Sequence, residues 1–198
     1  MRRAVLLALL VWTAACGDDE SDLPGGSAET LEAARQHCVD SGGEALTARP
    51  EYGTNSDPEA WLDLAGGAEL CRFENADDDT RIYVDLVTLY SEEPTLAGVA
   101  YLSRAGPALP EEPSANPATF NCAALGGSAQ WGSGVSGGGW VTSDRPTEVV
   151  DLCVFPDRSF IDEFGIFYYS GDAVRGIDLA TVMRYEPDEL PGIFSAHG

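Results

Sequence analysis

Two stretches of the chain follow one pattern: "DLCVFPDRSF" occupies residues 151–160, and "ELCRFENADD" occupies residues 69–78. In each, an acidic residue and a leucine precede a cysteine, a phenylalanine follows it by two positions, and acidic residues come next. The question is whether one structural unit occurs twice. The sequence around the two stretches indicates that it does.

The landmarks on either side repeat in the same order. "ARQHCVDSGG" (34–43) and "ATFNCAALGG" (118–127) each place a cysteine four residues after an alanine, and Gly-Gly begins four residues after the cysteine. Later, "TLYSEEP" (88–94) corresponds to "FYYSGDA" (167–173). Landmarks in one order with nearly constant spacing predict a tandem duplication. The expected organisation is a signal peptide at 1–15, an acidic tether at 16–27, a more degenerate module at 28–104, a linker at 105–115 and a second module at 116–198.

Each half begins with a predicted helix. In the second half, Asn116 is a favourable N-cap, Pro117 suits the first helical position, and Gly126 can adopt the left-handed conformation that ends a helix. The counterpart in the first half has Ser27 as its cap, Leu31, Ala34 and Cys38 on one face, and Gly42 as its end. Each helix is therefore expected to carry its cysteine on the buried side.

Short segments rich in β-branched and aromatic residues follow each helix, and they predict antiparallel strands. They span residues 45–48, 69–73, 81–90 and 99–102 in the first half, and 129–131, 149–155, 160–169 and 177–183 in the second. The predicted fold class is α+β, with two tandem modules that each place a short helix on a small antiparallel sheet.

The first sixteen residues have the pattern of an export signal. A basic Arg2-Arg3 pair precedes an apolar run that is too short to span a bilayer, and small residues precede Cys16. Small residues directly before a cysteine resemble the lipobox of bacterial lipoproteins, which implies lipidation of Cys16 and a bilayer anchor. The residue after Cys16 is not aspartate, so we expect the outer membrane. The alternatives are ordinary secretion and a Cys16 that belongs to the fold.

The predicted lipidation of Cys16 and export of the chain bear on how the cysteines pair. The chain has five cysteines, and an odd number in an exported protein needs an explanation. If Cys16 carries lipid, four remain, and an oxidising compartment favours two disulfides. Four cysteines allow three pairings. Duplication of an internal bridge favours Cys38–Cys71 with Cys122–Cys153, each stabilising its half by about 3–4 kcal/mol.

The charge balance is strongly acidic. The net charge is −22, and it becomes −24 when Arg2 and Arg3 leave with the signal peptide. The chain has no lysine. This balance argues against nucleic-acid partners and favours a basic protein or peptide or a divalent cation, although acidity also serves solubility alone.

Several familiar chemical motifs are present only in part. "GSGVSG" (132–137) matches a dinucleotide-loop pattern without a βαβ context, and Ser136 lies in a nucleophile-elbow pattern without a suitably placed histidine. The histidines, His37 and His197, are far apart in the sequence. We therefore predict no cofactor and no catalytic residue.

Two groups of acidic residues contain the donor atoms that metal binding or acid–base catalysis needs. The aspartates at 77–79 follow Glu74 and Asn75 but lack the alternating spacing of a calcium loop, which favours a solvated turn. Asp162 and Glu163 would point to opposite faces of a strand, which makes them a poor acid–base pair. We expect no metal site.

The second half resembles a small bacterial envelope family that is labelled hemolysin, or domain of unknown function 333. The pattern is Asn-Pro-Ala-Ser, Cys, Gly-Gly, then Cys-Val-Phe-Pro-Asp-Gly-Ser-x-Cys-Asp-Glu-Trp. The resemblance covers residues 114–170, and 28–91 is a degenerate copy. The matching residues are Asn116, Pro117, Ala118, Cys122, Gly126, Gly127, Cys153, Val154, Phe155, Pro156, Asp157, Asp162 and Glu163.

Three positions depart from that family pattern. Arg158 replaces the glycine, Ile161 the third cysteine, and Phe164 the tryptophan, and the family's fourth cysteine is also absent. The loss of those two cysteines implies that the two remaining ones pair with each other. Family members are small exported proteins or lipoproteins, some of them joined to inhibitor-like domains.

The expected function is that of a non-catalytic envelope lipoprotein acting as a binding or structural module, with aromatic residues at 164–169 as its contact surface. The alternative is an inhibitor of a basic protease or lysozyme-type hydrolase, which would insert residues 142–147 or Arg158 into its target. Membrane damage is disfavoured because the chain is acidic and shows no basic amphipathic helix.

Overall fold

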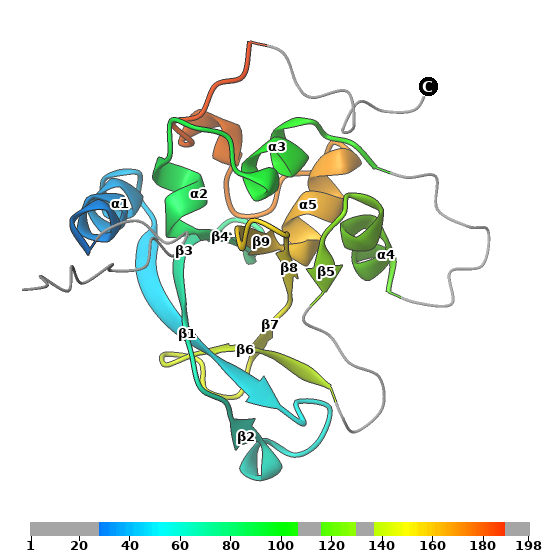
Figure 1. Ribbon diagram of the computed structural model, residues 1–198. Helices are drawn as coiled ribbons and strands as arrows, with labels where there is room; N and C mark the ends of the chain where they lie inside the picture. Colours follow the sequence, from blue (N-terminus) through cyan, green and yellow to red (C-terminus); the bar gives the residue numbers. More distant parts are fainter. Residues whose placement is uncertain (1–27, 107–115, 130–136, 189–198) are drawn as a thin grey trace, which may run out of the picture.

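A computed structural model describes residues 28–106, 116–129 and 137–188 of the chain. Within these ranges the fold is α+β, as expected, but the strands form one curled antiparallel sheet rather than one small sheet for each half, with helices packed at one end of it (Figure 1). The strands are β1 (Glu44–Tyr52), β2 (Leu62–Asp63), β3 (Ala68–Asn75), β4 (Thr80–Asp85), β5 (Ser128–Ala129), β6 (Gly138–Thr142), β7 (Val149–Val150), β8 (Leu152–Val154) and β9 (Phe160–Asp162).

The strand order is β5-β8-β9-β4-β3-β1-β6-β7, and β2 pairs with β1. Strands from the two halves of the chain therefore share one sheet. They meet where Val84 on β4 pairs with Ile161 on β9. A second crossing occurs farther along, where β6 pairs with β1 between Ala48 and Thr142. These pairings cover strand edges that separate small sheets would leave open.

The helices are α1 (Ala28–Asp40), α2 (Leu86–Tyr90), α3 (Leu96–Leu102), α4 (Pro117–Ala124) and α5 (Glu163–Ser170), with 3₁₀ turns at Pro58–Ala60 and Leu179–Thr181. Helix α1 packs beside α2, and α4 packs beside α5. Figure 1 shows these two pairs on opposite sides, with α3 between them. No helix among the described residues is both long and apolar enough to cross a bilayer.

Both disulfides lie beneath the helices and have the pairing favoured from the sequence, Cys38–Cys71 and Cys122–Cys153. Cys71 pairs across the sheet with Val84, and Cys153 pairs with Ile161. All four half-cystines are buried in the main apolar core, which also contains Phe73, Ile82, Leu86, Leu89, Tyr101, Phe155, Ile166 and Leu179.

Two predicted helices are confirmed. Helix α4 begins after Asn116, whose side chain accepts a hydrogen bond from the Ala118 N–H at 3.0 Å. Gly126 follows its end with a φ of 84°, and Gly42 follows α1 with a φ of 85°. Ser27, the expected cap of α1, lies outside the described residues, as do the signal segment, Cys16, the tether and most of the 105–115 linker.

Three segments predicted as strands are helical instead. Residues 86–90 form α2, 99–102 belong to α3, and 163–170 form α5, while the predicted strand at 177–183 contains a 3₁₀ turn. The physical reason is capping. Asp85, Thr95 and Asp162 each accept a hydrogen bond from a backbone N–H of the following helix. Their side chains stabilise these helix starts, and burial of the apolar residues outweighs β-propensity.

Candidate binding site

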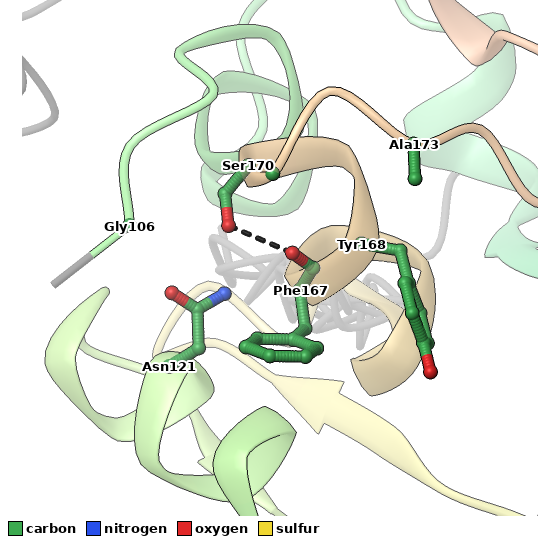
Figure 2. A pocket seen from close by; sticks show the side chains of 7 residues that line it. Gly106, Asn121, Phe167, Tyr168, Ser170 and Ala173 are labelled. Atoms are coloured by element: carbon green, nitrogen blue, oxygen red, sulfur yellow. Dashed lines mark hydrogen bonds between the residues drawn. The ribbon is translucent and has the colours of Figure 1, made fainter. Parts of the chain in front are cut away.

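A pocket of about 380 Å³ lies between α4 and α5, near the lower end of the range for small-molecule sites. Figure 2 shows it from close by. Asn121 comes from α4, and Phe167, Tyr168 and Ser170 come from α5. The lining is Gly106, Asn121, Phe167, Tyr168, Ser170, Gly171 and Ala173.

The Asn121 side chain is the polar centre of this pocket. It is 1% exposed, and neither its Oδ1 nor its Nδ2 has a hydrogen-bond partner among the described residues. Figure 2 shows its amide directed toward Gly106 and Ser170. An unpaired buried amide costs about 1–3 kcal/mol of stability, and most buried polar groups are hydrogen-bonded. A ligand that pairs with Asn121 would recover that free energy.

The remaining walls are aromatic or small. The rings of Phe167 and Tyr168 meet edge to face with centroids 5.5 Å apart, and Tyr168 is 41% exposed. The Ser170 hydroxyl donates to the Phe167 carbonyl oxygen at 2.7 Å, so its oxygen can still accept a hydrogen bond. None of the described residues lining the pocket carries a full charge at neutral pH. The site therefore suits a neutral, partly apolar group that offers both a donor and an acceptor.

A second, polar cavity of about 120 Å³ lies where β4, β9 and α5 meet β7. Asp151 and Asp162 line it, together with Arg81 and Arg175. Burial raises the pKa of Asp151 to about 7, and the neighbouring acids add to this. Burial also raises the pKa of Asp162 to about 6, against the opposing hydrogen bond from the Gly165 N–H. These carboxyl groups can hold protons close to neutral pH.

The structure corrects the placement of Asp162 and Glu163. They were expected on opposite faces of a strand, but Asp162 ends β9 and caps α5, and Glu163 begins that helix. Both are buried. Burial raises the pKa of Glu163, which lies inside the fold rather than in solvent.

The Asp157 carboxylate makes hydrogen bonds both within the β8–β9 turn and to a neighbouring helix. Its carboxylate accepts hydrogen bonds from the Ser159 N–H at 3.1 Å and from the Leu96 N–H at 2.8 Å. It therefore ties the β8–β9 turn to the start of α3. In that turn Phe155 is buried, whereas Pro156 is exposed.

The second glycine of each Gly-Gly pair, Gly43 or Gly127, lies against a disulfide. A Cβ built on Gly127 would lie 2.3 Å from Cys153 Sγ, and one on Gly43 would lie 2.5 Å from Cys71 Sγ. The motif positions Gly127, Cys122 and Cys153 thus have a structural use at the bridge, whereas Gly126 supplies the left-handed turn after α4.

The acidic turn at 77–79 is closed by its own polar groups. Asn75 accepts from the Asp77 N–H, and Asp78 accepts from the Thr80 N–H. In the described parts of the chain, no group of three or more His, Cys, Asp and Glu side chains could hold a metal ion.

The remaining motif residues lie apart from the pocket. His37 Nε2 donates to the Val182 carbonyl oxygen at 2.8 Å. Ser136, the glycine-loop residues before Gly137, and His197 lie outside the described residues.

The two segments that could insert into a target differ in how far they stand out from the fold. Residues 142–147 lie against the sheet, where Asp144 pairs with Arg72 at 2.6 Å and Arg145 pairs with Glu74 at 2.5 Å. Arg158, in contrast, is exposed at the tip of the β8–β9 turn with a φ of 67°.

The aromatic residues expected to form a contact surface at 164–169 differ in exposure, and Phe164 and Phe167 are half-buried. Ile166 and Tyr169 are buried, and Tyr168 is the residue of that segment with a large exposed fraction. The helical period of α5, not the strand period expected, decides which ring faces solvent.

Sequence reasoning did not single out Asn121, Ser170 or Asp151. Asn121 directly precedes Cys122, and a polar residue beside a buried half-cystine was the available signal. Gly106 comes from a distant part of the chain, which no local pattern reveals. Comparisons with family models, with curated proteins and with solved structures found no match to this chain.

Proposed function

We propose that this chain is a non-catalytic cell-envelope lipoprotein, anchored through acylated Cys16 in the outer membrane, that acts as a binding module. Its ligand site is the pocket between α4 and α5. The observation that carries the proposal is the buried amide of Asn121, which faces that pocket and has no hydrogen-bond partner in the part of the chain that the structure describes. The anchor rests on the signal pattern and small residues before Cys16.

The proposal includes a tandem duplication into two disulfide-tied modules. Several matching positions support it. Cys71 pairs with Val84 as Cys153 pairs with Ile161, and Leu70 pairs with Asp85 as Leu152 pairs with Asp162. The helix pairs α1–α2 and α4–α5 then correspond, as do Gly43 and Gly127 beside the bridges.

Membership of the hemolysin-labelled family belongs to the same proposal. Its support is the run of motif residues from Asn116 to Glu163, which build α4, the second bridge and the β8–β9 turn. No pore-forming activity is part of this proposal.

A second candidate function is inhibition of a basic hydrolase, and exposed Arg158 favours it. Its turn is held by the Asp157 hydrogen bonds and would lose little conformational freedom on insertion into a cleft. The net charge of −24 for the mature chain would speed association with a basic target.

The test is capture of ligand from envelope extract by the mature chain carrying Cys16→Ser, at low and high salt. We expect a component whose capture is lost with Asn121→Leu and retained with Gln36→Leu, which removes an exposed amide from α1. Equal capture by all three chains would overturn the pocket as the site. Capture of a basic hydrolase that depends on Arg158 and on low salt would instead establish the inhibitor.

A further inference from the structure

The two helix pairs offer a comparison inside one molecule. His37 directly precedes the bridged Cys38 on α1, and Asn121 directly precedes the bridged Cys122 on α4. On the partner helices, Tyr90 follows the capping Asp85 by five residues and Phe167 follows Asp162 by five, two residues before Tyr169, the counterpart of Tyr90 in the sequence repeat. His37 and Asn121 thus hold corresponding positions, each next to an aromatic residue of the second helix.

The α1–α2 pair holds a peptide segment that belongs to the chain itself. The Val182 carbonyl oxygen accepts a hydrogen bond from His37 Nε2 at 2.8 Å. Two residues on, the Arg184 N–H donates to the Leu89 carbonyl oxygen at 3.3 Å. The Arg184 guanidinium lies 4.5 Å from the centre of the Tyr90 ring. Backbone amide groups and one side chain therefore dock this segment.

The α4–α5 pair lacks such a segment among the described residues. Arg104 lies 4.2 Å from the centre of the Tyr169 ring and pairs with Asp172, which resembles the contact of Arg184 with Tyr90. However, no carbonyl oxygen of the described residues reaches Asn121 as that of Val182 reaches His37. The cavity at α4–α5 is about 380 Å³, whereas the one beside α1–α2 is about 240 Å³.

We propose that the α4–α5 pocket binds an extended peptide segment of another protein, through one backbone amide. This inference rests on the proposed function and names its ligand class. Asn121 Nδ2 donates to a peptide carbonyl, and Asn121 Oδ1 accepts from a peptide N–H. An uncharged apolar side chain of the ligand packs on Phe167 and Ala173, because the described pocket lining has no charged side chain.

Neighbouring contacts agree with a chain-like ligand. The Ser170 oxygen keeps an open acceptor site beside Asn121, which a second backbone N–H can use. Gly106 leaves room there, since a Cβ at this position would lie 2.8 Å from Ser170 Oγ. The exposed Tyr168 ring extends the apolar surface beyond the pocket mouth.

The experiment is an NMR titration of the mature Cys16→Ser chain with acetyl-Ala-Leu-Ala-amide. We expect saturable shifts at the Asn121 side-chain amide and at the Gly106 and Ser170 backbone amides. An ester analogue that lacks one N–H should bind at least about fivefold more weakly, because it removes one half of the amide pair. Asn121→Leu should weaken binding at least about tenfold, and Gln36→Leu should leave it unchanged.

A stability measurement on Asn121→Leu and a second variant, Ala173→Leu, distinguish a loss of binding from a loss of folding. Asn121→Leu is expected to raise Tm, because it removes an unpaired buried amide, and a lowered Tm would assign Asn121 a structural role and overturn the proposal. Ala173→Leu fills the pocket from its exposed edge without changing a buried polar group. It is expected to abolish the titration shifts, and undiminished binding would place the peptide elsewhere.

The sugar N-acetylglucosamine carries the same acetamide on a different scaffold and is titrated in parallel. Saturation of the pocket by the sugar alone would overturn the peptide class and leave the pocket as the binding site. Failure of both probes, with capture from envelope extract still lost in Asn121→Leu, would also overturn the peptide class only. Failure of both probes together with Asn121-independent capture would overturn the proposed function as well.

Discussion

Asp85 and Asp162 hold matching places in the sheet: each ends its strand, and each pairs with a leucine that directly precedes a disulfide cysteine. Each also caps the helix that follows, through the Val87 N–H at 3.1 Å and the Gly165 N–H at 2.8 Å. Burial raises the pKa of Asp85 to about 7 and that of Asp162 to about 6. The caps thus carry a proton within the fold at mildly acidic pH.

The free energy of unfolding should therefore rise as pH falls from about 8 to about 5. Asp85, Asp151 and Asp162 keep protons in the folded chain with pKa values of about 7, 7 and 6, while the unfolded chain releases them near pH 4. In that window the folded state binds more protons, so stability decreases with increasing pH and levels off above about 7.

Thermal unfolding between pH 5 and pH 8 measures this dependence. We expect Tm to be higher at pH 5 by at least about 2–4 °C, the shift for 1 kcal/mol in a chain of this size. Asp162→Asn should keep the helix cap and flatten the dependence, because asparagine caps without ionising. A Tm that falls on acidification across this window would show that the buried acids are charged in the folded chain.

Gly43→Ala and Gly127→Ala should each destabilise the fold by about 1–3 kcal/mol. Their Cβ atoms would lie 2.5 Å from Cys71 Sγ and 2.3 Å from Cys153 Sγ, and the bridges are buried with no space to move. Denaturant unfolding measures the change. Gly67→Ala is the control, since its nearest contact would be 3.4 Å and its effect should stay within about 0.5 kcal/mol. A tolerated Gly127→Ala would mean that the second bridge is loosely packed.

Removing either disulfide should cost about 3–4 kcal/mol. The bridges close loops with sequence separations of 33 and 31, so the two losses should be nearly equal. The comparison is Cys38→Ser with Cys71→Ser against Cys122→Ser with Cys153→Ser, by guanidinium unfolding without reductant. A loss below about 1 kcal/mol for one pair only would contradict the equivalence of the two halves.

Arg72→Met should destabilise the chain by about 2–4 kcal/mol. The Arg72 side chain is 6% exposed and pairs with Glu44 at 2.5 Å, Glu74 at 3.2 Å and Asp144 at 2.6 Å, which joins β1 and β3 to the loop after β6. Hydrogen exchange at residues 142–147 should accelerate with the loss of stability.

The matched control for Arg72 is Arg81→Met, which breaks the exposed pair with Glu148 and should change stability by less than about 1 kcal/mol. Equal effects of the two substitutions would show that the Arg72 cluster adds nothing beyond surface ion pairs.

Helix ends were predictable from the sequence where a residue type strongly prefers one position, such as asparagine at the N-cap or glycine after the last turn. Asn116, Pro117 and Gly126 marked the bounds of α4, and Gly42 marked the end of α1. The segments after Asp85 and Asp162 were predicted wrongly, because aromatic and β-branched residues favour strands in short windows. In the folded chain these segments are helices, because the capping hydrogen bonds and the burial of their apolar residues against the disulfides stabilise the helical conformation.

The sequence by itself determined the α+β class and the acidic charge, because these depend on composition and on spacing along the chain. The repeat favoured one cysteine pairing out of three, and the structure has that pairing. Only the tertiary structure decided that β4 pairs with β9, that β6 crosses to β1, and that Asn121 faces a pocket with Gly106 and Ser170. Those contacts join residues far apart in sequence. They form because open strand edges pair with other strands and apolar helix faces pack against the sheet. The local sequence does not specify which distant strand or helix becomes the partner.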